Sequence, residues 1–346
     1  MLPLFNPDNI SANFCRYITT IDSHTEGEST RLIVDGIGDI PGLSMMDKLS
    51  FFRSNLDHVR CQLTKEPRGS REILAAAITE NINDNSSFGL LYMDAKRYPY
   101  LCGHATIGAI TTLWQTGFLK LKEGENTVLV DTPAGVMNTM ATVINDRVTS
   151  VAINMVPSFV YNTDKTIVIE DFGKITIDIV CTGGFFAMVD TNPLGIEPVL
   201  KNKGVLVKLG MKIIEAANQQ LQVAHPVQSD VTSVDVCEFY DSEEKEGVAQ
   251  GRSLVIYGES HMDRSPCGTG TAAKLALLHN RQKLAINQPY INSSPLGTSF
   301  KASLVEEVTI GHLPAVVTKI EGRAWVTGVH HFLLDETDPF PHGFLI

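Results

Sequence analysis

The stretch Cys102-Gly103-His104-Ala105-Thr106-Ile107-Gly108-Ala109 decides the fold, because a similar stretch, Cys267-Gly-Thr-Gly-Thr-Ala-Ala-Lys274, follows 165 residues later. In both, a Cys-Gly pair ends a polar segment, a threonine stands four residues after the cysteine, and small residues open a helical pattern. The two stretches therefore predict one strand–loop–helix module used twice, in an α/β chain with two pseudo-symmetric halves.

Each cysteine of the repeat is expected at the N-terminus of a helix. The unpaired N–H groups there, together with the positive end of the helix dipole, favour a thiolate, and they also bind carboxylates. Inverting a stereocentre by proton transfer needs a base on one face of the carbon and an acid on the other. Two such cysteines would supply both groups, with the substrate carboxylate held between the two helices and no need for a metal or a prosthetic group.

Around the repeat, apolar runs alternate with turn signals. The chain of 346 residues favours two domains. We place them at residues 1–145 and 146–320, with the segment from about 320 to 346 as a candidate to pack on the first. Helices are predicted at 44–58, 107–114, 205–219 and 269–278, and strands at 17–21, 30–34, 90–93, 128–130, 136–143, 167–169, 175–180, 185–189, 254–257, 304–310, 315–320 and 324–332.

The net charge of the chain excludes some classes of binding partner. The formal net charge is −11 and no run of Lys and Arg is present, which argues against a nucleic acid or an anionic membrane. The N-terminus does not read as a signal peptide, and no apolar run reaches the length of a membrane span. We therefore expect a cytoplasmic protein that acts on a small molecule.

The six cysteines are widely spaced and form no CxxC pair, so reduced thiols are expected rather than disulfides or a zinc site. Cys15, Cys61, Cys181 and Cys237 are interpreted as small buried apolar residues. His24 is expected to hold a turn, and the pair His330-His331 to lie in a strand, because no third metal ligand stands at a useful spacing.

Several blocks resemble the proline racemase family from about residue 17 to the end of the chain. The blocks are Asp22-Ser-His-Thr-Glu-Gly-Glu28, Glu66-Pro-Arg-Gly69, Cys102-Gly-His104, Asp131-Thr-Pro-Ala-Gly135, Asp263-Arg-Ser-Pro-Cys-Gly-Thr-Gly-Thr271 and Asp338-Pro-Phe-Pro-His-Gly-Phe344. The resemblance implies the diaminopimelate epimerase-like fold, with two α/β halves, the active site in the cleft between them, no cofactor and a homodimer.

The same resemblance implies roles for single residues. Cys102 and Cys267 are the acid/base pair, and Asp263 and His104 orient the substrate. The backbone of Gly103, His104, Gly268 and Thr269 binds the substrate carboxylate.

The substrate is expected to be proline, with 4-hydroxyproline as the alternative. Family members that dehydrate trans-3-hydroxyproline typically carry a threonine in place of one catalytic cysteine, whereas this chain keeps both, which favours inversion over dehydration. The pair Gly69-Ser70, which follows Glu66-Pro-Arg, is more like the sequence of the 4-hydroxyproline epimerases at this place. Two aromatic walls of the proline pocket map to Leu74 and Tyr257, which would admit a more polar or larger substrate.

Three other interpretations compete. Gly268-Thr-Gly-Thr-Ala-Ala273 matches a dinucleotide fingerprint, but a polar, proline-containing segment precedes it instead of a strand, so a nicotinamide-dependent oxidoreductase is disfavoured. A cysteine hydrolase with Cys102 and His104 would leave Cys267 unexplained, and side chains two residues apart are not expected to point together. A non-catalytic solute-binding protein would still bind its ligand after Cys102→Ser, whereas an enzyme would lose turnover.

Overall fold

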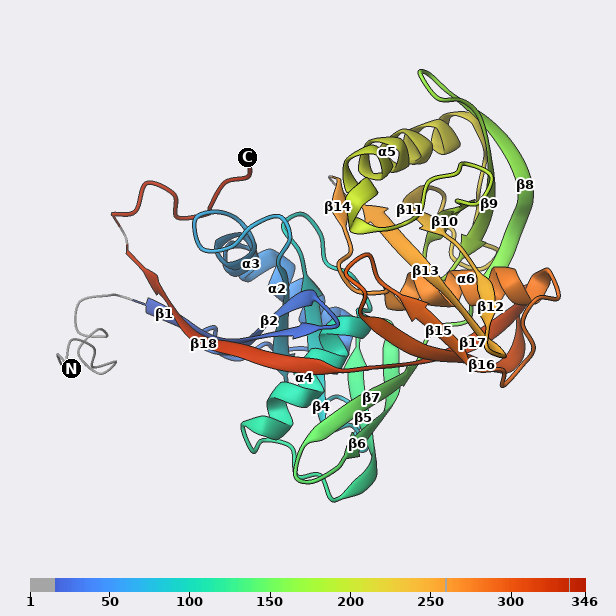
Figure 1. Ribbon diagram of the computed structural model, residues 1–346. Coiled ribbons are helices and arrows are strands. Elements are labelled where there is room, and N and C mark those ends of the chain that lie inside the picture. Colours follow the sequence, from blue (N-terminus) through green and yellow to red (C-terminus); the bar gives the residue numbers. More distant parts are fainter. Residues whose placement is uncertain (1–15, 259, 336) are drawn as a thin grey trace. The chain divides into compact units, whose positions relative to one another are not determined.

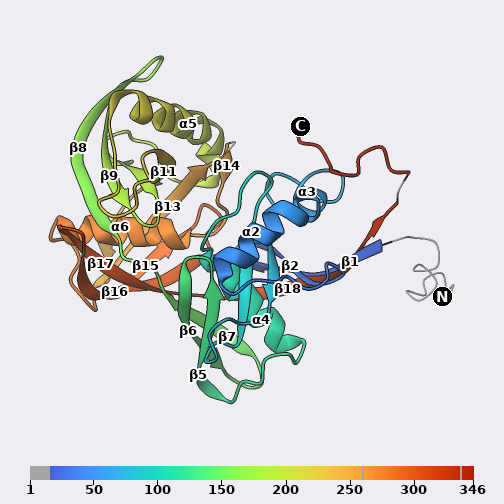
Figure 2. The ribbon, with the colours of Figure 1, turned by 180° about the vertical axis from the view of Figure 1, so that it is seen from behind.

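The computed structural model describes residues 16–258, 260–335 and 337–346 (Figure 1; Figure 2 shows the reverse side). Within them the chain forms two compact units. The first contains the described residues up to Thr25, Ser29–Val151 and Ala324–Ile346, and the second contains Glu26–Glu28 and Ala152–Arg323. The prediction that Cys15 is buried lies outside the described residues.

The first unit is a mixed sheet with helices on both faces. Its helices are α2 (Met45–Asn55), α3 (Asp57–Thr64) and α4 (Gly103–Gln115). Its strands are β1 (Arg16–Thr25), β2 (Glu28–Asp35), β3 (Leu74–Thr79), β4 (Phe88–Met93), β5 (Gly124–Thr132), β6 (Gly135–Val143), β7 (Val148–Asn154, which runs into the second unit) and β18 (Ala324–Leu334). β1 pairs antiparallel with β18 along its whole length, although the two strands stand at opposite ends of the sequence.

The centre of this sheet is buried on both sides. In β4, Leu91 and Met93 belong to the core under α2, whereas the Tyr92 hydroxyl on the other face meets Thr106 of α4. The helix α2 lies in front of the sheet in Figure 2 and behind it in Figure 1, which shows α4 from the other face. A strand covered on both faces needs no polar alternation, which is why 88–93 reads as a continuous apolar run.

The second unit repeats this plan. Its helices are η1 (Leu200–Asn202, a 3₁₀ turn), α5 (Lys203–Gln220) and α6 (Gly268–Asn280). Its strands are β8 (Phe159–Ile169), β9 (Gly173–Cys181), β10 (Phe185–Asp190), β11 (Val234–Tyr240), β12 (Glu243–Lys245), β13 (Val248–Tyr257), β14 (His261–Met262), β15 (Tyr290–Ser293), β16 (Ser299–Ile310) and β17 (Leu313–Gly322). α5 buries Leu206, Leu209 and Ile213 against the apolar residues of β11 and β13.

The duplicated module is visible strand by strand. In the first unit, β3 and β4 pair antiparallel, α4 follows, β5 returns parallel to β4, and β6 pairs antiparallel with β5. In the second unit, β11 and β13 pair antiparallel, α6 follows, β15 returns parallel to β13, and β16 pairs antiparallel with β15. The predicted α/β class with two pseudo-symmetric halves is confirmed.

Two local predictions are wrong. The single helix expected at 44–58 is two helices, because Leu56 leaves the helical region at φ −122° and ψ 12°, and α3 then runs on to Thr64. His24, expected in a turn, lies in β1, where its ring stacks on Trp325 of β18 at 5.1 Å between centroids. No helix in the described part of the chain is long and apolar enough to cross a membrane.

Candidate active site

Cys102 is the residue that caps the N-terminus of α4, as the sequence predicts. It takes an extended conformation (φ −148°, ψ 109°) and is 9% exposed. Its Sγ lies 3.4 Å from Nδ1 and 3.7 Å from Nε2 of His104. The expectation that these two side chains would not point together is wrong, because the extended N-cap turns its side chain over the first helical turn, where the His104 ring also lies.

Buried hydrogen bonds fix the backbone around Cys102. Thr106 donates its hydroxyl to the Cys102 carbonyl at 2.8 Å, and the Tyr92 hydroxyl lies 2.6 Å from that of Thr106. Burial raises the pKa of Tyr92 well above its usual value, so its phenol stays neutral. On the other side, Thr25 donates its hydroxyl to the His104 carbonyl at 2.7 Å.

Cys267 caps α6 in the equivalent position but with a different geometry. Its φ is +58°, in the left-handed region that non-glycine residues rarely occupy. Its Sγ accepts a hydrogen bond from the N–H of Gly270 at 3.4 Å and lies 3.5 Å from the Thr269 hydroxyl. A Cβ on Gly270 would come within 2.7 Å of Glu238 Oε2 and 3.2 Å of the Cys267 Cβ, so only glycine fits beneath this sulfur.

Asp263 is buried and organises the loop that leads to Cys267. Its Oδ1 accepts hydrogen bonds from both the N–H and the hydroxyl of Ser265, each at 2.8 Å. The Ser265 hydroxyl oxygen in turn accepts the N–H of Cys267 at 3.1 Å. One oxygen of Asp263 therefore holds the turn that presents Cys267.

The pKa of Cys267 lies well above its usual value of 9.0. Burial is the largest cause, and the negative charge of Asp263 adds to it, while the hydrogen bonds from Thr269 and Gly270 act in the opposite direction. The sequence predicted an environment that favours the thiolate, because it identified the helix N-terminus but not the burial. Desolvation outweighs the hydrogen bonds from Thr269 and Gly270, so burial favours the neutral thiol of Cys267.

The other predicted substrate residues fall in both units. Gly103 and His104 open α4, and Gly268 and Thr269 open α6, so all four stand in first helical turns, whose N–H groups have no partner within the helix. Leu74 is the first residue of β3 and is 8% exposed.

Tyr257 is the last residue of β13, and its ring centroid lies 4.7 Å from that of His261. It is partly buried. β14 ends at Met262, so the loop 263–267 separates the last strand residue from the glycines of α6. This differs from a dinucleotide fingerprint, in which the strand runs directly into the glycines.

Some sequence blocks have structural roles that the sequence did not reveal. Asp22 binds the buried guanidinium of Arg31 through both carboxylate oxygens, and Arg31 also donates to the carbonyls of Leu63 and Arg68. Asp131 accepts the N–H groups of 82 and 83 and the hydroxyl of Ser86. Both carboxylates hold loops in place.

The remaining candidates for metal or thiol chemistry are structural. Cys61, Cys181 and Cys237 are buried free thiols, and burial raises the pKa of Cys181 to about 12. His330 and His331 lie in β18, as predicted. Among residues 16–258, 260–335 and 337–346, no group of three or more His, Cys, Asp or Glu side chains is arranged to hold a metal ion.

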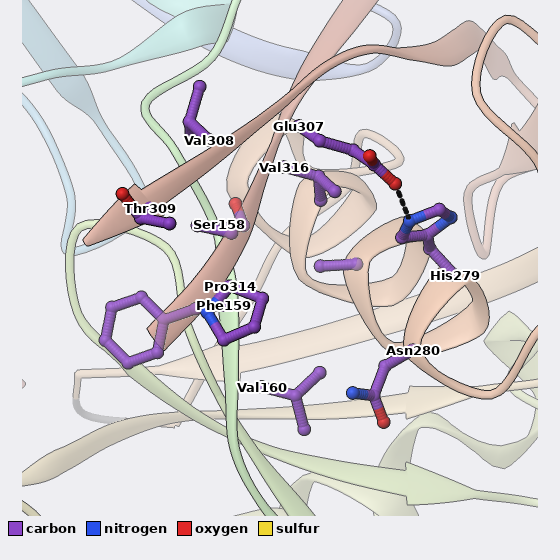
Figure 3. Close-up of a pocket in the computed structure, with 12 residues that line it drawn as sticks. Ser158, Phe159, Val160, His279, Asn280, Glu307, Val308, Thr309, Pro314 and Val316 are labelled. Atoms are coloured by element: carbon purple, nitrogen blue, oxygen red, sulfur yellow. Dashed lines mark hydrogen bonds and ion pairs between the residues drawn. The ribbon is translucent and has the colours of Figure 1, made fainter. Parts of the chain in front are cut away.

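A cavity of about 540 Å³ lies in the second unit, beside the C-terminal end of α6 (Figure 3). Phe159, Pro314 and Val316 line it, and the Nε2 of His279 meets the Glu307 carboxylate at 3.0 Å at its edge. None of the predicted site residues lines this cavity. Cys267 caps the opposite end of α6.

Comparison with known proteins shows which family the chain belongs to. The family model described as proline racemase matches residues 20–345. The chain is 38% identical to the proline racemase of Clostridioides difficile, covering 96% of this chain and 99% of the relative. It is 36% identical to the 4-hydroxyproline 2-epimerase of Streptosporangium roseum, with the same coverage. A crystal structure of a hydroxyproline epimerase from Agrobacterium vitis with bound trans-4-hydroxy-L-proline is 30% identical, covers 96% of both chains and superposes with a TM-score of 0.87.

Two α/β units with a cysteine-capped helix each, and these relatives, define an isomerase of the racemase and epimerase class. The chain belongs to the proline racemase family. The predicted resemblance and the fold it implied are confirmed.

Proposed function

We propose that this enzyme inverts the α-carbon of proline by a two-base proton transfer between Cys102 and Cys267. The observation that carries the proposal is that the two cysteines cap α4 and α6, the equivalent helices of the duplicated module. Each unit thus contributes one acid/base sulfur beside a set of N–H donors.

The proposed reaction is balanced within the site. The thiolate of one cysteine takes the α-proton from one face, and the thiol of the other gives its own proton to the opposite face. The roles of Cys102 and Cys267 exchange for the other enantiomer, so no cofactor is consumed or required. The N–H groups of the first turns of α4 and α6 hold the substrate carboxylate and stabilise the charge that develops as the α-proton leaves.

The surroundings of the two sulfurs differ. Burial and the charge of Asp263 favour the thiol form of Cys267, which is the form that donates a proton in one direction of the reaction. The His104 ring lies within 3.4 Å of the Cys102 sulfur, where it can exchange a proton with the thiol or orient the substrate. A cysteine hydrolase would use the same Cys102–His104 contact but would leave the matching Cys267 without a role.

The second candidate is 4-hydroxyproline 2-epimerisation by the same mechanism. Tyr257 would offer a hydroxyl to a ring substituent, and Leu74 is smaller than an aromatic wall. Named relatives carry both activities at similar identity. We propose proline first, acting in the cytoplasm as a homodimer.

The test is the change of optical rotation with L-proline, which should fall to zero, and with trans-4-hydroxy-L-proline, which should move toward that of an epimer mixture. Cys102→Ser and Cys267→Ser should each lower the rate on the order of 10³-fold, the size expected for a lost acid/base group. Cys61→Ser is the matched control and should keep full activity, because Cys61 is a buried thiol outside the proposed site that donates a hydrogen bond to Asp57, as a serine hydroxyl also can. Full activity in either of the first two variants would reject the two-base assignment.

A further inference from the structure

The turn between β1 and β2, together with the first residue of β2, belongs to the second unit, whereas the rest of both strands belongs to the first. Glu26–Glu28 is part of the second unit, whereas Thr25 and Ser29 belong to the first. The N–H of Glu26 donates to the Arg323 carbonyl at 3.2 Å, and its carboxylate accepts the Arg323 N–H at 3.1 Å. Thr298 donates its hydroxyl to the Glu26 carbonyl at 2.6 Å. The turn is therefore firmly bonded to the second unit.

Glu28, the first residue of β2, is 1% exposed and bonds to Arg264 in the loop before Cys267. Its carboxylate accepts three hydrogen bonds from Arg264: the main-chain N–H at 2.8 Å, Nε at 3.0 Å and Nη2 at 3.0 Å. A buried carboxylate is costly unless it is well paired, and here both the backbone and the fork of one arginine pair it. Glu28 thus fixes the position of Arg264 in two ways.

A second side chain, from β14 just before this loop, lies beside Glu28. Nε2 of His261 lies 3.3 Å from Glu28 Oε1, and the imidazole is 8% exposed. His261 comes two residues before Asp263, and Arg264 directly after it. Glu28 therefore contacts residues on both sides of Asp263.

We propose that Glu28 is a positioning residue that sets the geometry of Cys267 by holding the loop 263–267 through Arg264. The inference rests on the proposed function, in which Cys267 is one of the two acid/base groups. From Arg264 the loop continues through Ser265, whose hydroxyl accepts the N–H of Cys267. Cys267 itself has a φ of +58°, which a non-glycine residue keeps only where its surroundings impose it. Glu28, by fixing Arg264, adds to the constraint that Asp263 and Ser265 impose on this loop.

Glu28→Gln tests this directly, because it keeps the size of the side chain and removes its charge. The expected result is a kcat lower on the order of tenfold to hundredfold with KM changed less than threefold, since a misplaced acid/base group slows chemistry more than binding. Arg264→Lys keeps the charge but not the fork and should fall between Glu28→Gln and the natural protein. Glu26→Gln is the matched control, because Glu26 stands in the same turn but bonds to Arg323; its kcat should stay within twofold.

Alkylation by iodoacetamide gives a readout that needs no substrate. In Glu28→Gln the loosened loop should raise the alkylation rate of Cys267 at least fivefold, with that of Cys102 unchanged, as measured by mass spectrometry of the two peptides. If both the alkylation rate of Cys267 and kcat stay unchanged in Glu28→Gln, the inference is overturned. An equal rise in the alkylation rates of both cysteines would also overturn it, because that indicates general loosening of the protein. Failure of the proposed function would instead show in the natural protein, as no racemisation, while the alkylation result still decides the role of Glu28.

Discussion

Cys102 and Cys267 hold the same position in two copies of one module, yet their surroundings differ. The Cys102 sulfur faces an imidazole, whereas the Cys267 sulfur faces a backbone N–H, a hydroxyl and the charge of Asp263. A helix N-terminus favours a thiolate by a limited amount, and burial can exceed it. The position of each sulfur therefore does not by itself fix its protonation.

The raised pKa of Cys267 predicts a specific pH dependence in the free protein. A thiol with a pKa above 9.0 is almost wholly protonated at pH 7, so its alkylation rate should rise about tenfold per pH unit up to pH 9 without a plateau. Asp263→Asn keeps the oxygen that binds Ser265 but removes the negative charge. This should lower the pKa of Cys267 and raise its alkylation rate at pH 8. The measurement is the iodoacetamide rate between pH 6 and 10, and a plateau below pH 8 in the unmodified protein would contradict it.

At the residue scale, the sequence predicts what is local and misses what needs tertiary structure. The repeat placed Cys102 and Cys267 at helix N-termini, and both are N-caps. The contact between Cys102 and His104 depends on how both side chains turn over the helix end, which spacing does not show. The contact between Glu28 and Arg264 joins residues 236 apart, and no periodicity announces it.

At the scale of elements, α6 rests on a buried polar network rather than on apolar contacts alone. Lys274 of α6 is fully buried and donates to the Asn292 side chain at 2.9 Å. Ser253 donates to Glu238 at 2.6 Å and lies 3.2 Å from the same Asn292 oxygen. Asn292 also donates to the Pro266 carbonyl at 3.1 Å, next to Cys267. The network therefore connects α6, and Pro266 just before its N-cap Cys267, to β11, β13 and β15.

Glu238→Gln should destabilise the second unit by about 1 kcal/mol at pH 7, because a pKa of about 7 leaves Glu238 about half ionised there and Asp241 also supplies negative charge near Lys274. Burial raises the pKa of Glu238 to about 7 and lowers that of Lys274 to about 8, and in each case the partner's charge opposes the shift. The double variant Glu238→Gln/Lys274→Met should lose less than the sum of the two single variants. Denaturant unfolding of all four proteins checks this, and strict additivity would contradict the coupling.

Elements with a clear apolar period were predicted, and those shaped by tertiary packing were missed. The strand Leu74–Thr79 has the sequence Leu-Ala-Ala-Ala-Ile-Thr, which shows no alternation and is rich in a poor strand former. It becomes a strand because it pairs with β2 on one side and β4 on the other. The strands at 148–154, 234–240 and 290–293 were likewise not predicted.

At the scale of the whole molecule, the first unit is completed by the end of the chain. β18 and the segment after it return to the first unit after the whole of the second has been built. The tail then bonds to the segment after α3: Glu66 and Phe344 exchange both backbone hydrogen bonds, at 3.0 and 2.9 Å, and Gln62 donates to the Pro341 carbonyl at 2.9 Å. Arg68 pairs with Asp338. This explains why sequence blocks near residue 66 and near residue 340 belong together.

Removal of residues 338–346 should therefore loosen 62–69 and leave the second unit unchanged. Each lost hydrogen bond contributes about 1 kcal/mol, so amide exchange at 62–69 should accelerate at least tenfold, while the amides of α5 and β9 keep their rates. Hydrogen–deuterium exchange read by mass spectrometry gives both regions in one experiment. The matched variant Arg68→Gln in the full-length chain removes one of these contacts and should give a smaller increase confined to the same peptides. If residues 62–69 of the truncated protein exchange as slowly as in the full chain, the tail does not hold this segment. If exchange rises equally in α5, the two units do not respond independently.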